Sequence, residues 1–507
     1  MNLGTLLPHH ALTRGDHTAV VFEDTRLSYR EFNARVNRLA NALVAEGIAK
    51  DHKIATVLPN CQELLDLYWA VAKIGAVVVP LSPLLKEGAL GNLLDASDSV
   101  MVFTDIALAE VVDAVRGKVP GIADGRYILV GGGAADGFRG FEDLVAGASE
   151  DEPPTVEIGR DDPYNIIYSS GTTGEPKGIV HTHYIRGMYC TQFCASLRVA
   201  PESVILHTGS LVFNGAFLMF LTAFYAGATF VLHRQFNAEA AIRAMRDEKV
   251  SHIMLVPAQV IQLLQHPDFT LENVGSLEMV LSLGAPLHLE HKRQLEERLP
   301  GRFHEIYGLT EGFITLLDKT DFPAKPESVG TPLPLFEMRI VDDHGNDLAP
   351  GEVGEIVGRG PMTMPGYYGR PDLTAEAIHD GWLYSGDLGY ADEDGFLYLV
   401  DRKKDMIISG GVNVFPRDIE EVAVEHPAIA EVAIFGAAHE KWGETPVAAV
   451  LLADGAKADP DEIKQWVNAR VGAKFQRLHD VLIMDEFPRN AAGKTLKRVL
   501  RDEYGAS

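Results

Sequence analysis

The stretch Y-S-S-G-T-T-G-E-P-K-G, residues 168–178, says more about the fold of this chain than any other segment. It combines three glycines and four Ser/Thr residues with one lysine, Lys177. Apolar residues precede it at 164–167 and follow it from 179, so we predict a loop between two buried strands. Glycines let backbone N–H groups turn toward an anion, and hydroxyl groups add donors. The sequence therefore predicts a loop that binds a polyphosphate.

A P-loop NTPase is the first alternative for this segment. The Walker A motif requires G-x-x-x-x-G-K-[ST] followed by a helix. Here Lys177 is followed by Gly178 and then by β-branched residues, so the spacing does not fit. A second near match at 493–495 fails because Pro488 stands where a glycine is needed. A surface hairpin rich in turn residues is the other alternative, and composition alone would favour it.

Length and charge limit the class of protein. A chain of 507 residues predicts two to four domains at about 150 residues each. The apolar fraction of 46% and the charged fraction of 23% are ordinary for a globular protein. The net charge of −26 disfavours binding to nucleic acid or to an anionic membrane. An anionic cofactor must therefore be bound by local basic groups.

The cysteines and the first residues indicate the compartment. Cys61, Cys190 and Cys194 cannot all pair with one another, and their spacing fits no metal site. Residues 1–16 lack the charged and apolar regions of a secretory signal. We therefore expect a cytoplasmic protein with reduced thiols.

One apolar stretch is long enough to span a bilayer. Residues 203–232 contain no Asp, Glu, Lys or Arg. Gly209, Gly215 and Gly227 interrupt this stretch, and residues 228–233 change to β-branched and aromatic types. We predict a buried helix, a glycine break and a buried strand, and therefore no integral membrane segment.

Helical and strand patterns alternate over the first half of the chain, which predicts mostly parallel sheets covered by helices. The expected helices are 29–46, 63–74 and 238–249, and the expected strands are 54–60, 76–81, 100–103, 127–130 and 252–257. After about Pro323 the strands become short, as at 337–341 and 354–357, which suits antiparallel hairpins or a small barrel. Beyond the charge run at 401–405, about 100 residues remain for a separate α+β domain.

Five further motifs lie along the chain. They are S-L-G-A-P at 282–286, Y-G-L-T-E at 307–311, Y-S-G-D-L at 384–388, D-R-K-K-D-M-I-I-S-G-G-V-N-V-F-P at 401–416 and F-P-R-N-A-A-G-K at 487–494. Taken singly, each fits an ordinary alternative: a turn into a helix capped by Thr310, a G-D turn, a solvated charge run or a surface lysine. Together with the glycine-rich loop, and in this order, they resemble the adenylate-forming superfamily of acyl-CoA and aryl-CoA synthetases, luciferases and peptide-synthetase adenylation domains.

The resemblance extends from about residue 27 to Lys494 and carries expectations for the fold. It implies an α/β protein with a large N-terminal domain of two α/β sheets and a small β-barrel. A smaller, mobile C-terminal α+β domain follows. We place the N-terminal AMP-binding domain at 1–400 and the C-terminal domain at 401–507.

The resemblance also assigns a nucleotide site. It implies that Tyr307 packs against adenine, that Thr310 contacts the α-phosphate and that Glu311 helps to hold Mg²⁺, a cation that favours carboxylate oxygen. Asp387 and Arg402 would contact the ribose, the carboxylate as an acceptor for its hydroxyl groups. The other ATP and AMP contacts implied by the resemblance are Ser169, Ser170, Gly171, Thr172, Thr173, Gly174, Lys177, Gly284, Ala285, Pro286, His304, Glu305, Gly308 and Asn413.

The resemblance assigns the remaining catalytic and mobile parts as well. Lys494 would be the catalytic lysine of adenylation, and His183 matches a Thr-His pair beside the phosphate loop, although a lone histidine is more often structural. Lys404 falls at the hinge between the domains. The loop of Ser409, Gly410 and Gly411 would approach CoA after the domains rearrange, since glycines leave room for a thiol arm.

The acyl pocket departs from the family pattern. Many relatives carry a histidine in a P-x-F-H motif at its mouth, where residues 210–213 here read S-L-V-F. The candidate lining is mostly small or apolar and suits a medium-chain, branched or aryl acid; it consists of Phe213, Asn214, Gly215, Gly284, Gly312 and Phe313. We see no charged residue there to pair with a second carboxylate.

The expected function is ATP-dependent activation of a small carboxylic acid to acyl-AMP, with release of pyrophosphate, followed by transfer to CoA. ATP, Mg²⁺ and CoA are the expected cofactors and co-substrates, and family frequency suggests a homodimer. One alternative is a stand-alone enzyme that loads the thiol of a carrier protein, although the 13 residues after Lys494 are too few to hold a carrier domain. The other is a non-catalytic nucleotide-binding protein on the same fold.

Overall fold

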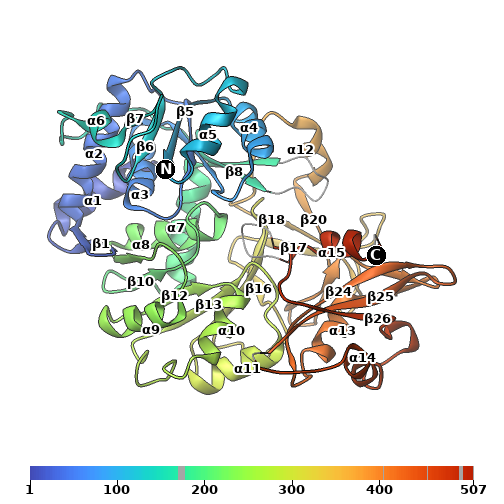
Figure 1. The fold of residues 1–507 in the computed structure, drawn as a ribbon. Coiled ribbons are helices and arrows are strands. Elements are labelled where there is room, and N and C mark those ends of the chain that lie inside the picture. Colours follow the sequence, from blue (N-terminus) through green and yellow to red (C-terminus); the bar gives the residue numbers. More distant parts are fainter. Residues whose placement is uncertain (170–176, 404, 454, 490–494, 506–507) are drawn as a thin grey trace.

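The computed structural model describes residues 1–169, 177–403, 405–453, 455–489 and 495–505, with the exception of the Ser169 side chain. It contains four sheets. Figure 1 shows two helix-covered sheets, in blue to cyan and in green, beside an orange and red C-terminal part. Among the described residues, no helix is both long enough and apolar enough to cross a membrane.

The first sheet carries the glycine-rich segment at its edge. Its strand order is β7-β6-β5-β3-β4-β8-β9, and among its described strands only β8 and β9 pair antiparallel. The strands are β3 (Lys53–Val57), β4 (Val77–Leu81), β5 (Ser99–Asp105), β6 (Tyr127–Val130), β7 (Arg139–Gly140), β8 (Pro163–Ser169) and β9 (Lys177–Thr182). The helices of this part are α1 (Leu6–Thr13), α2 (Tyr29–Ala45), α3 (Gln62–Ile74), α4 (Glu87–Ala96), α5 (Ala109–Val115) and α6 (Phe141–Val145), with 3₁₀ turns at Leu3–Thr5 and Arg116–Lys118.

The second sheet has nine strands in the order β16-β15-β14-β13-β12-β10-β11-β1-β2, and its central strands are parallel. The strands are β1 (Thr18–Phe22), β2 (Thr25–Ser28), β10 (Val204–His207), β11 (Thr229–Leu232), β12 (His252–Leu255), β13 (Met279–Leu283), β14 (Phe303–Gly308), β15 (Ile314–Leu317) and β16 (Thr331–Pro332). Its helices are α7 (His183–Leu197), α8 (Asn214–Ala226), α9 (Ala238–Asp247), α10 (Pro257–Gln265) and α11 (Leu289–Arg298). The alternating pattern predicted mostly parallel sheets covered by helices, and the family resemblance implied two of them; both expectations are confirmed.

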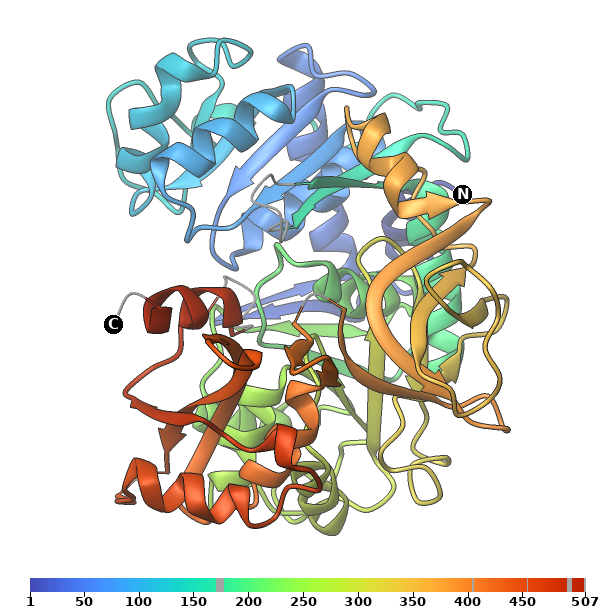
Figure 2. The ribbon, with the colours of Figure 1, turned by 90° about the vertical axis from the view of Figure 1, so that its right-hand side faces the viewer.

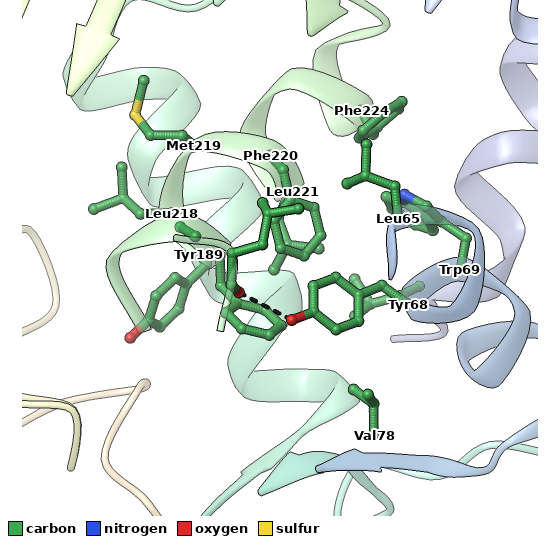
Figure 3. Packing of buried hydrophobic residues seen from close by; sticks show 14 of the residues in the cluster. Leu65, Tyr68, Trp69, Val78, Tyr189, Leu218, Met219, Phe220, Leu221 and Phe224 are labelled. Carbon is green, nitrogen blue, oxygen red and sulfur yellow. Dashed lines mark hydrogen bonds between the residues drawn. The ribbon is translucent and has the colours of Figure 1, made fainter. Parts of the chain in front are cut away.

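Helices α7 and α8 form the layer between the two sheets. Helix α7 packs on β8 and β9 of the first sheet, and α8 packs on β10 and β11 of the second. Figure 3 shows the aromatic core that this layer shares with α3, including Tyr68, Trp69 and Phe220. The ring centroids of Tyr68 and Phe220 are 5.4 Å apart, and Tyr68 donates a hydrogen bond to the Leu211 carbonyl at 2.9 Å.

Short-range sequence signals explain where these helices begin and end. Ser28 caps α2 in a reciprocal capping box with Glu31, whose carboxylate accepts the Ser28 backbone N–H at 2.8 Å. Gly75 ends α3 and Gly227 ends α8, both in the left-handed conformation that glycine tolerates best.

The apolar stretch 203–232 has one element more than we predicted. The buried helix (α8), the break at Gly227 and the buried strand (β11) are confirmed. The first residues of the stretch form another strand, β10, which lies between β11 and β12. A four-residue strand has no amphipathic period of its own, so the sequence did not separate it from the helix.

The region after Pro323 is antiparallel, as predicted. Its five strands pair in the order β17-β18-β20-β19, with β21 also along β20. They are β17 (Glu337–Val341), β18 (Gly354–Arg359), β19 (Ile378–His379), β20 (Trp382–Ala391) and β21 (Leu397–Arg402), and α12 (Pro371–Ala377) precedes β19. Figure 2 shows β20, in orange, bending strongly along its length.

The C-terminal part has its own sheet and its own apolar core. The strands are β22 (Ile407–Ser409), β23 (Val412–Val414), β24 (Ile429–His439), β25 (Gly443–Leu452) and β26 (Asp480–Met484). The helices are α13 (Pro416–Ala423), α14 (Pro460–Asn468) and α15 (Lys497–Gly505), with a 3₁₀ turn at Lys474–Gln476. The predicted fold class, a large N-terminal part with several sheets and a smaller C-terminal α+β part, is confirmed.

Several polar contacts among the described residues join α13 of the C-terminal part to the sheets before it. The Arg417 guanidinium donates to the Leu399 carbonyl at 3.0 Å, and the Glu421 carboxylate lies 3.1 Å from Nδ1 of His288 on the second sheet's side. These contacts fix α13 against the antiparallel unit and against the N-terminus of α11.

Candidate active site

The predicted strand–loop–strand around residues 168–178 is confirmed at both ends. Strands β8 and β9 pair antiparallel, with Tyr168 opposite Gly178 and Ser169 opposite Lys177. The predicted loop residues Ser170, Gly171, Thr172, Thr173 and Gly174 lie outside the described residues, as do Lys404 and Lys494.

Lys177 has a defined neighbour. Its ammonium group lies 5.0 Å from the centroid of the Tyr367 ring, within cation–π range. The Tyr367 segment is held against β9 because the backbone N–H of Tyr368 donates to the Gly178 carbonyl at 2.7 Å. The first residues of β9, at the end of the predicted phosphate loop, are thus in contact with Tyr367 and Tyr368, shortly before α12.

Tyr307, Asp387 and Arg402 converge from three strands. The Tyr307 hydroxyl donates to the Asp387 carboxylate at 2.9 Å, and Nε of Arg402 lies 3.2 Å from the other carboxylate oxygen. Asp387 and Arg402 are direct partners in the pairing of β20 with β21. Burial, followed by the charge of Asp387, raises the pKa of the Tyr307 hydroxyl, which therefore remains a donor at neutral pH. The family resemblance assigned all three residues to one site, and the structure brings them together.

The Y-G-L-T-E motif is a tight turn between two antiparallel strands. The Leu309 N–H donates to the Phe313 carbonyl at 2.9 Å, and β14 continues into β15. The alternative that Thr310 caps a helix is therefore wrong, because a strand follows. Gly312 has φ = 115°, and a Cβ there would overlap the Met362 backbone, so only glycine fits this close approach.

Glu311 and Thr310 each receive a hydrogen bond that the sequence did not reveal. The Tyr367 hydroxyl donates to Oε1 of Glu311 at 2.9 Å, and burial together with that carboxylate raises the pKa of Tyr367. Nε2 of His181 lies 2.8 Å from the Thr310 carbonyl. His181 lies on β9, 129 positions before Thr310, and Tyr367 lies 56 positions after Glu311. No local sequence pattern therefore marks either residue as part of the site.

A divalent cation would rest on few protein ligands here. Among the described residues, no group of three or more His, Cys, Asp or Glu side chains could hold a metal ion. Glu311 is the carboxylate beside the phosphate-loop stem, and one carboxylate with phosphate oxygens and water is a common magnesium site. The residues present therefore fit a Mg²⁺ ion that arrives with the nucleotide.

His183 is enclosed at the start of α7. Its Nδ1 accepts the Leu3 backbone N–H at 3.3 Å, and its ring packs against Tyr164 at 5.4 Å. Burial lowers the pKa of His183 to about 4, so the imidazole is neutral at physiological pH. Among the described residues, these contacts are structural, and a catalytic role for His183 remains a prediction.

His304 and Glu305 point to opposite faces of β14. His304 lies 3.5 Å from Asp318, on the side away from Tyr307, because side chains alternate along a strand. Glu305 shares a face with Tyr307 but pairs with Lys292 at 2.5 Å, and both partners are buried. Nucleotide contacts by these two residues would therefore involve the backbone, which lies beside Tyr307 and Gly308.

The remaining predicted pocket residues gather where β13 ends and α8 begins. Gly284 has φ = 92° and turns the chain after β13 toward Ala285 and Pro286. A Cβ at Gly215 would lie 3.2 Å from Leu283, so the start of α8 abuts the end of β13. Asn214 donates to the Tyr189 hydroxyl at 3.0 Å. Phe313 is fully buried, with its ring centroid 6.5 Å from that of Tyr307.

The predicted CoA loop is the turn of a hairpin. Gly410 (φ = 60°) and Gly411 (φ = 84°) connect β22 and β23, the Gly-Gly pattern of a two-residue turn. The Gly410 N–H donates to the Trp442 carbonyl at 2.7 Å. Asn413 lies on β23 opposite Ile408, with its side chain exposed.

Comparison with known families and proteins identifies the family of this chain. The AMP-binding enzyme family matches residues 7–368, and the AMP-binding enzyme C-terminal domain matches residues 418–494. The chain is 34% identical over 493 residues to a feruloyl-CoA synthase of Amycolatopsis sp, covering 96% of each chain. It is 33% identical over 513 residues to the long-chain-fatty-acid–CoA ligase FadD13 of Mycobacterium tuberculosis, covering 100% of this chain and 99% of the relative.

Solved structures extend the likeness to the whole fold. The ATP-bound structure of MatB from Rhodopseudomonas palustris aligns with a TM-score of 0.90 at 29% identity, covering 100% of this chain and 99% of that one. The apo structure of the same protein aligns with a TM-score of 0.78, so the fold of this chain superposes better on the ATP-bound structure than on the apo structure.

The fold, the Tyr307–Asp387–Arg402 group and the two family matches define an AMP-binding enzyme. The chain belongs to the adenylate-forming acyl-CoA synthetase family, as its motifs predicted, and it is an acid–thiol ligase.

Proposed function

We propose that this enzyme joins a carboxylic acid to CoA in two steps, with acyl-AMP as the intermediate and pyrophosphate as the first product. The observation that carries the proposal is the convergence of Tyr307, Asp387 and Arg402 beside the Thr310–Glu311 turn. The names of the two relatives, which cover an aryl acid and long-chain fatty acids, leave the acid open. Our prediction is a medium-chain, branched or aryl acid.

The nucleoside end of the site is matched to ribose and adenine. The Asp387 carboxylate has spare acceptor capacity after its contacts with Tyr307 and Arg402, because an ionised carboxylate has about four lone-pair sites. Two ribose hydroxyl groups are donors of the right kind. The Tyr307 ring, anchored through its hydroxyl, offers a flat apolar face to adenine.

The first step needs fixed positive charge and donors around the α-phosphorus. The acid's carboxylate oxygen forms a bond to that phosphorus, and the bond to the bridging oxygen of pyrophosphate breaks. Lys177 is held over Tyr367 near the Glu311 turn, and Lys494 supplies the second cation in our proposal. Mg²⁺ held by Glu311 would neutralise phosphate charge. Preorganised groups of this kind lower the barrier because they need no reorientation during the reaction.

The second step requires the C-terminal domain to turn. We propose that it rotates about Lys404, withdraws Lys494 and brings the Gly410–Gly411 turn to the site. The CoA thiol then attacks the acyl carbon, and AMP leaves with the oxygen that the acid contributed. The domain division at 400/401 and a homodimer are parts of this proposal that follow from family resemblance. Domain motions of this kind often set kcat.

Two alternative functions, loading of a carrier protein and nucleotide binding without catalysis, can each be tested. A carrier-protein thiol in place of CoA would give the same first step but no acyl-CoA. A non-catalytic nucleotide-binding protein would give neither product. Incubation with ATP, Mg²⁺ and a panel of acids, with and without CoA, separates all three outcomes. We expect acid-dependent pyrophosphate release and CoA-dependent thioester; acid-dependent pyrophosphate release without thioester, or no pyrophosphate with any acid, would contradict the proposal.

A further inference from the structure

Arg186, on the first turn of α7, is completely buried between the two large sheets. Its Nε donates to Oδ1 of Asn165 at 2.8 Å. Its two terminal nitrogens, Nη1 and Nη2, are buried and have no hydrogen-bond partner among the described residues. None of the carboxylates in the described part of the chain forms an ion pair with it. A buried cation without a counter-charge is costly, so this arrangement calls for a reason.

Aromatic rings leave one edge of the guanidinium open. The guanidinium carbon lies 4.6 Å from the centroid of the Tyr189 ring and 4.2 Å from that of Phe217, which stabilises the charge in part. Since Nε is used by Asn165, the free edge is the one that carries Nη1 and Nη2. This edge has the geometry that binds the two oxygens of a carboxylate in parallel.

A second unpaired polar atom lies on the neighbouring helix. Oδ1 of Asn214 is buried without a partner, while its Nδ2 donates to the Tyr189 hydroxyl at 3.0 Å. The oxygen and nitrogen of an amide are exchangeable by a flip. In the flipped orientation Tyr189 donates to Oδ1, and the NH₂ group becomes free to donate to an anion. Figure 3 shows that the Tyr189 hydroxyl points away from Tyr68 and Trp69, out of the aromatic core.

Arg186 is also connected to the reaction site. Asn165 Nδ2 lies 3.5 Å from Nδ1 of His181, whose Nε2 lies 2.8 Å from the Thr310 carbonyl. Asn214 and Gly215 are partly exposed, and a Cβ at Gly215 would lie 3.2 Å from Leu283 at the end of β13. Arg186 is therefore linked to the Thr310 turn through Asn165 and His181, and it lies on the helix that packs against α8.

We propose that Arg186, with Asn214 and Tyr189, binds a distal carboxylate of the acid, so that the enzyme activates a dicarboxylic acid at one end while holding the other. This inference rests on the proposed function and names its substrate class. It differs from our expectation from the sequence, which saw no charged residue in the acyl pocket to pair with a second carboxylate. Arg186 and Tyr189 lie three positions apart on α7, and the packing of α7 against α8 brings Asn214 to the same tyrosine.

The test uses matched substrate pairs with the full-length protein. Pyrophosphate release is measured with straight-chain monocarboxylates and α,ω-dicarboxylates of the same length, from four to ten carbons, and with benzoate against terephthalate. Each dicarboxylate is also compared with its half-amide, which keeps the shape but not the charge. We expect kcat/KM for the best dicarboxylate to exceed those of its monocarboxylate and half-amide by at least about tenfold. A wild-type enzyme that favours the monocarboxylate in every pair would overturn the inference and leave the proposed function intact.

Variants then assign the preference to Arg186. Arg186→Met keeps an apolar chain between Tyr189 and Phe217 and should reverse the preference, whereas Arg186→Lys should retain part of it. Arg139→Met removes a guanidinium that pairs with Glu46 at 2.6 Å in the first sheet and should leave the preference unchanged. If Arg186→Met unfolds, Asn214→Leu and the wild-type comparison still decide. An equal loss for both members of a pair in Arg186→Met would show a structural cation and would refute the subsite.

Discussion

Replacing Tyr367 by phenylalanine tests the contact that holds Glu311. The change removes only the hydroxyl that donates to Glu311 at 2.9 Å and keeps the ring under Lys177. Hydrogen bonds to charged groups contribute about 1.5–3 kcal/mol, and Glu311 is partly exposed, so we expect a loss of about 1–2 kcal/mol. Because each 1.36 kcal/mol is tenfold in rate, kcat/KM for ATP should fall about 5–30-fold. More Mg²⁺ should be needed for half-maximal activity.

The neighbouring residue provides a matched control. Tyr368 also donates to a carboxylate, Asp98, at 2.7 Å, and a lysine, Lys53, lies 5.2 Å from its ring centroid. That group faces the first sheet and not the Glu311 turn. The assay is pyrophosphate release at varied ATP and Mg²⁺, with Tm measured for each protein. Equal effects of Tyr367→Phe and Tyr368→Phe on kcat/KM would refute the role of Tyr367, as would a loss that added Mg²⁺ leaves unchanged.

Further predictions address both half-reactions, the contact between α13 and α11, and one buried carboxyl group. Lys494→Ala should abolish pyrophosphate release yet still form thioester from supplied acyl-AMP; equal loss in both assays would remove Lys494 from the first step. Gly411→Leu, at φ = 84°, should do the reverse, and an unchanged thiolation rate would place CoA elsewhere. Glu421→Gln weakens the contact between α13 and His288, a pair worth under about 1 kcal/mol. We therefore expect adenylation to slow about two- to fivefold more than thiolation. Equal slowing of both steps would show that this contact does not stabilise the domain arrangement needed for adenylation. Burial raises the pKa of Asp401 to about 6, so the folded protein retains a proton between about pH 4 and 6 that the unfolded chain has lost, and this group's contribution to stability falls as pH rises through that range. Asp401→Asn should therefore gain Tm relative to the wild type from pH 4 to pH 7, and a constant difference would show that Asp401 does not titrate there.

Many helices, strands and turns could be predicted from the sequence because each depends on residues that are close together in the chain. The glycine-rich segment, the helix that starts at Ser28 and the break at Gly227 each depend on residues within a few positions. The change from parallel to antiparallel strands after Pro323 was readable from strand length and turn residues. The resemblance then supplied the Tyr307–Asp387–Arg402 group, which no periodicity could assemble from positions 80 residues apart.

The contacts that tune the site were not predictable in the same way. His181 meets Thr310 across 129 positions, and Tyr367 meets Glu311 across 56. The burial of Arg186 was not predicted because an arginine in a helix is more often solvent-exposed than buried. Its burial follows from α7 lying between two sheets, a fact of tertiary packing.

The central claim is that the acid's carboxylate attacks the α-phosphorus of ATP. The most direct measurement uses the best acid of the panel with both carboxylate oxygens labelled with ¹⁸O, in the presence of ATP, Mg²⁺ and CoA. If acyl-AMP is the intermediate, the oxygen that bonded to phosphorus leaves with AMP when the thiol attacks. The account predicts one ¹⁸O in each AMP formed; AMP without label, or label in inorganic phosphate with ADP as the product, would contradict it.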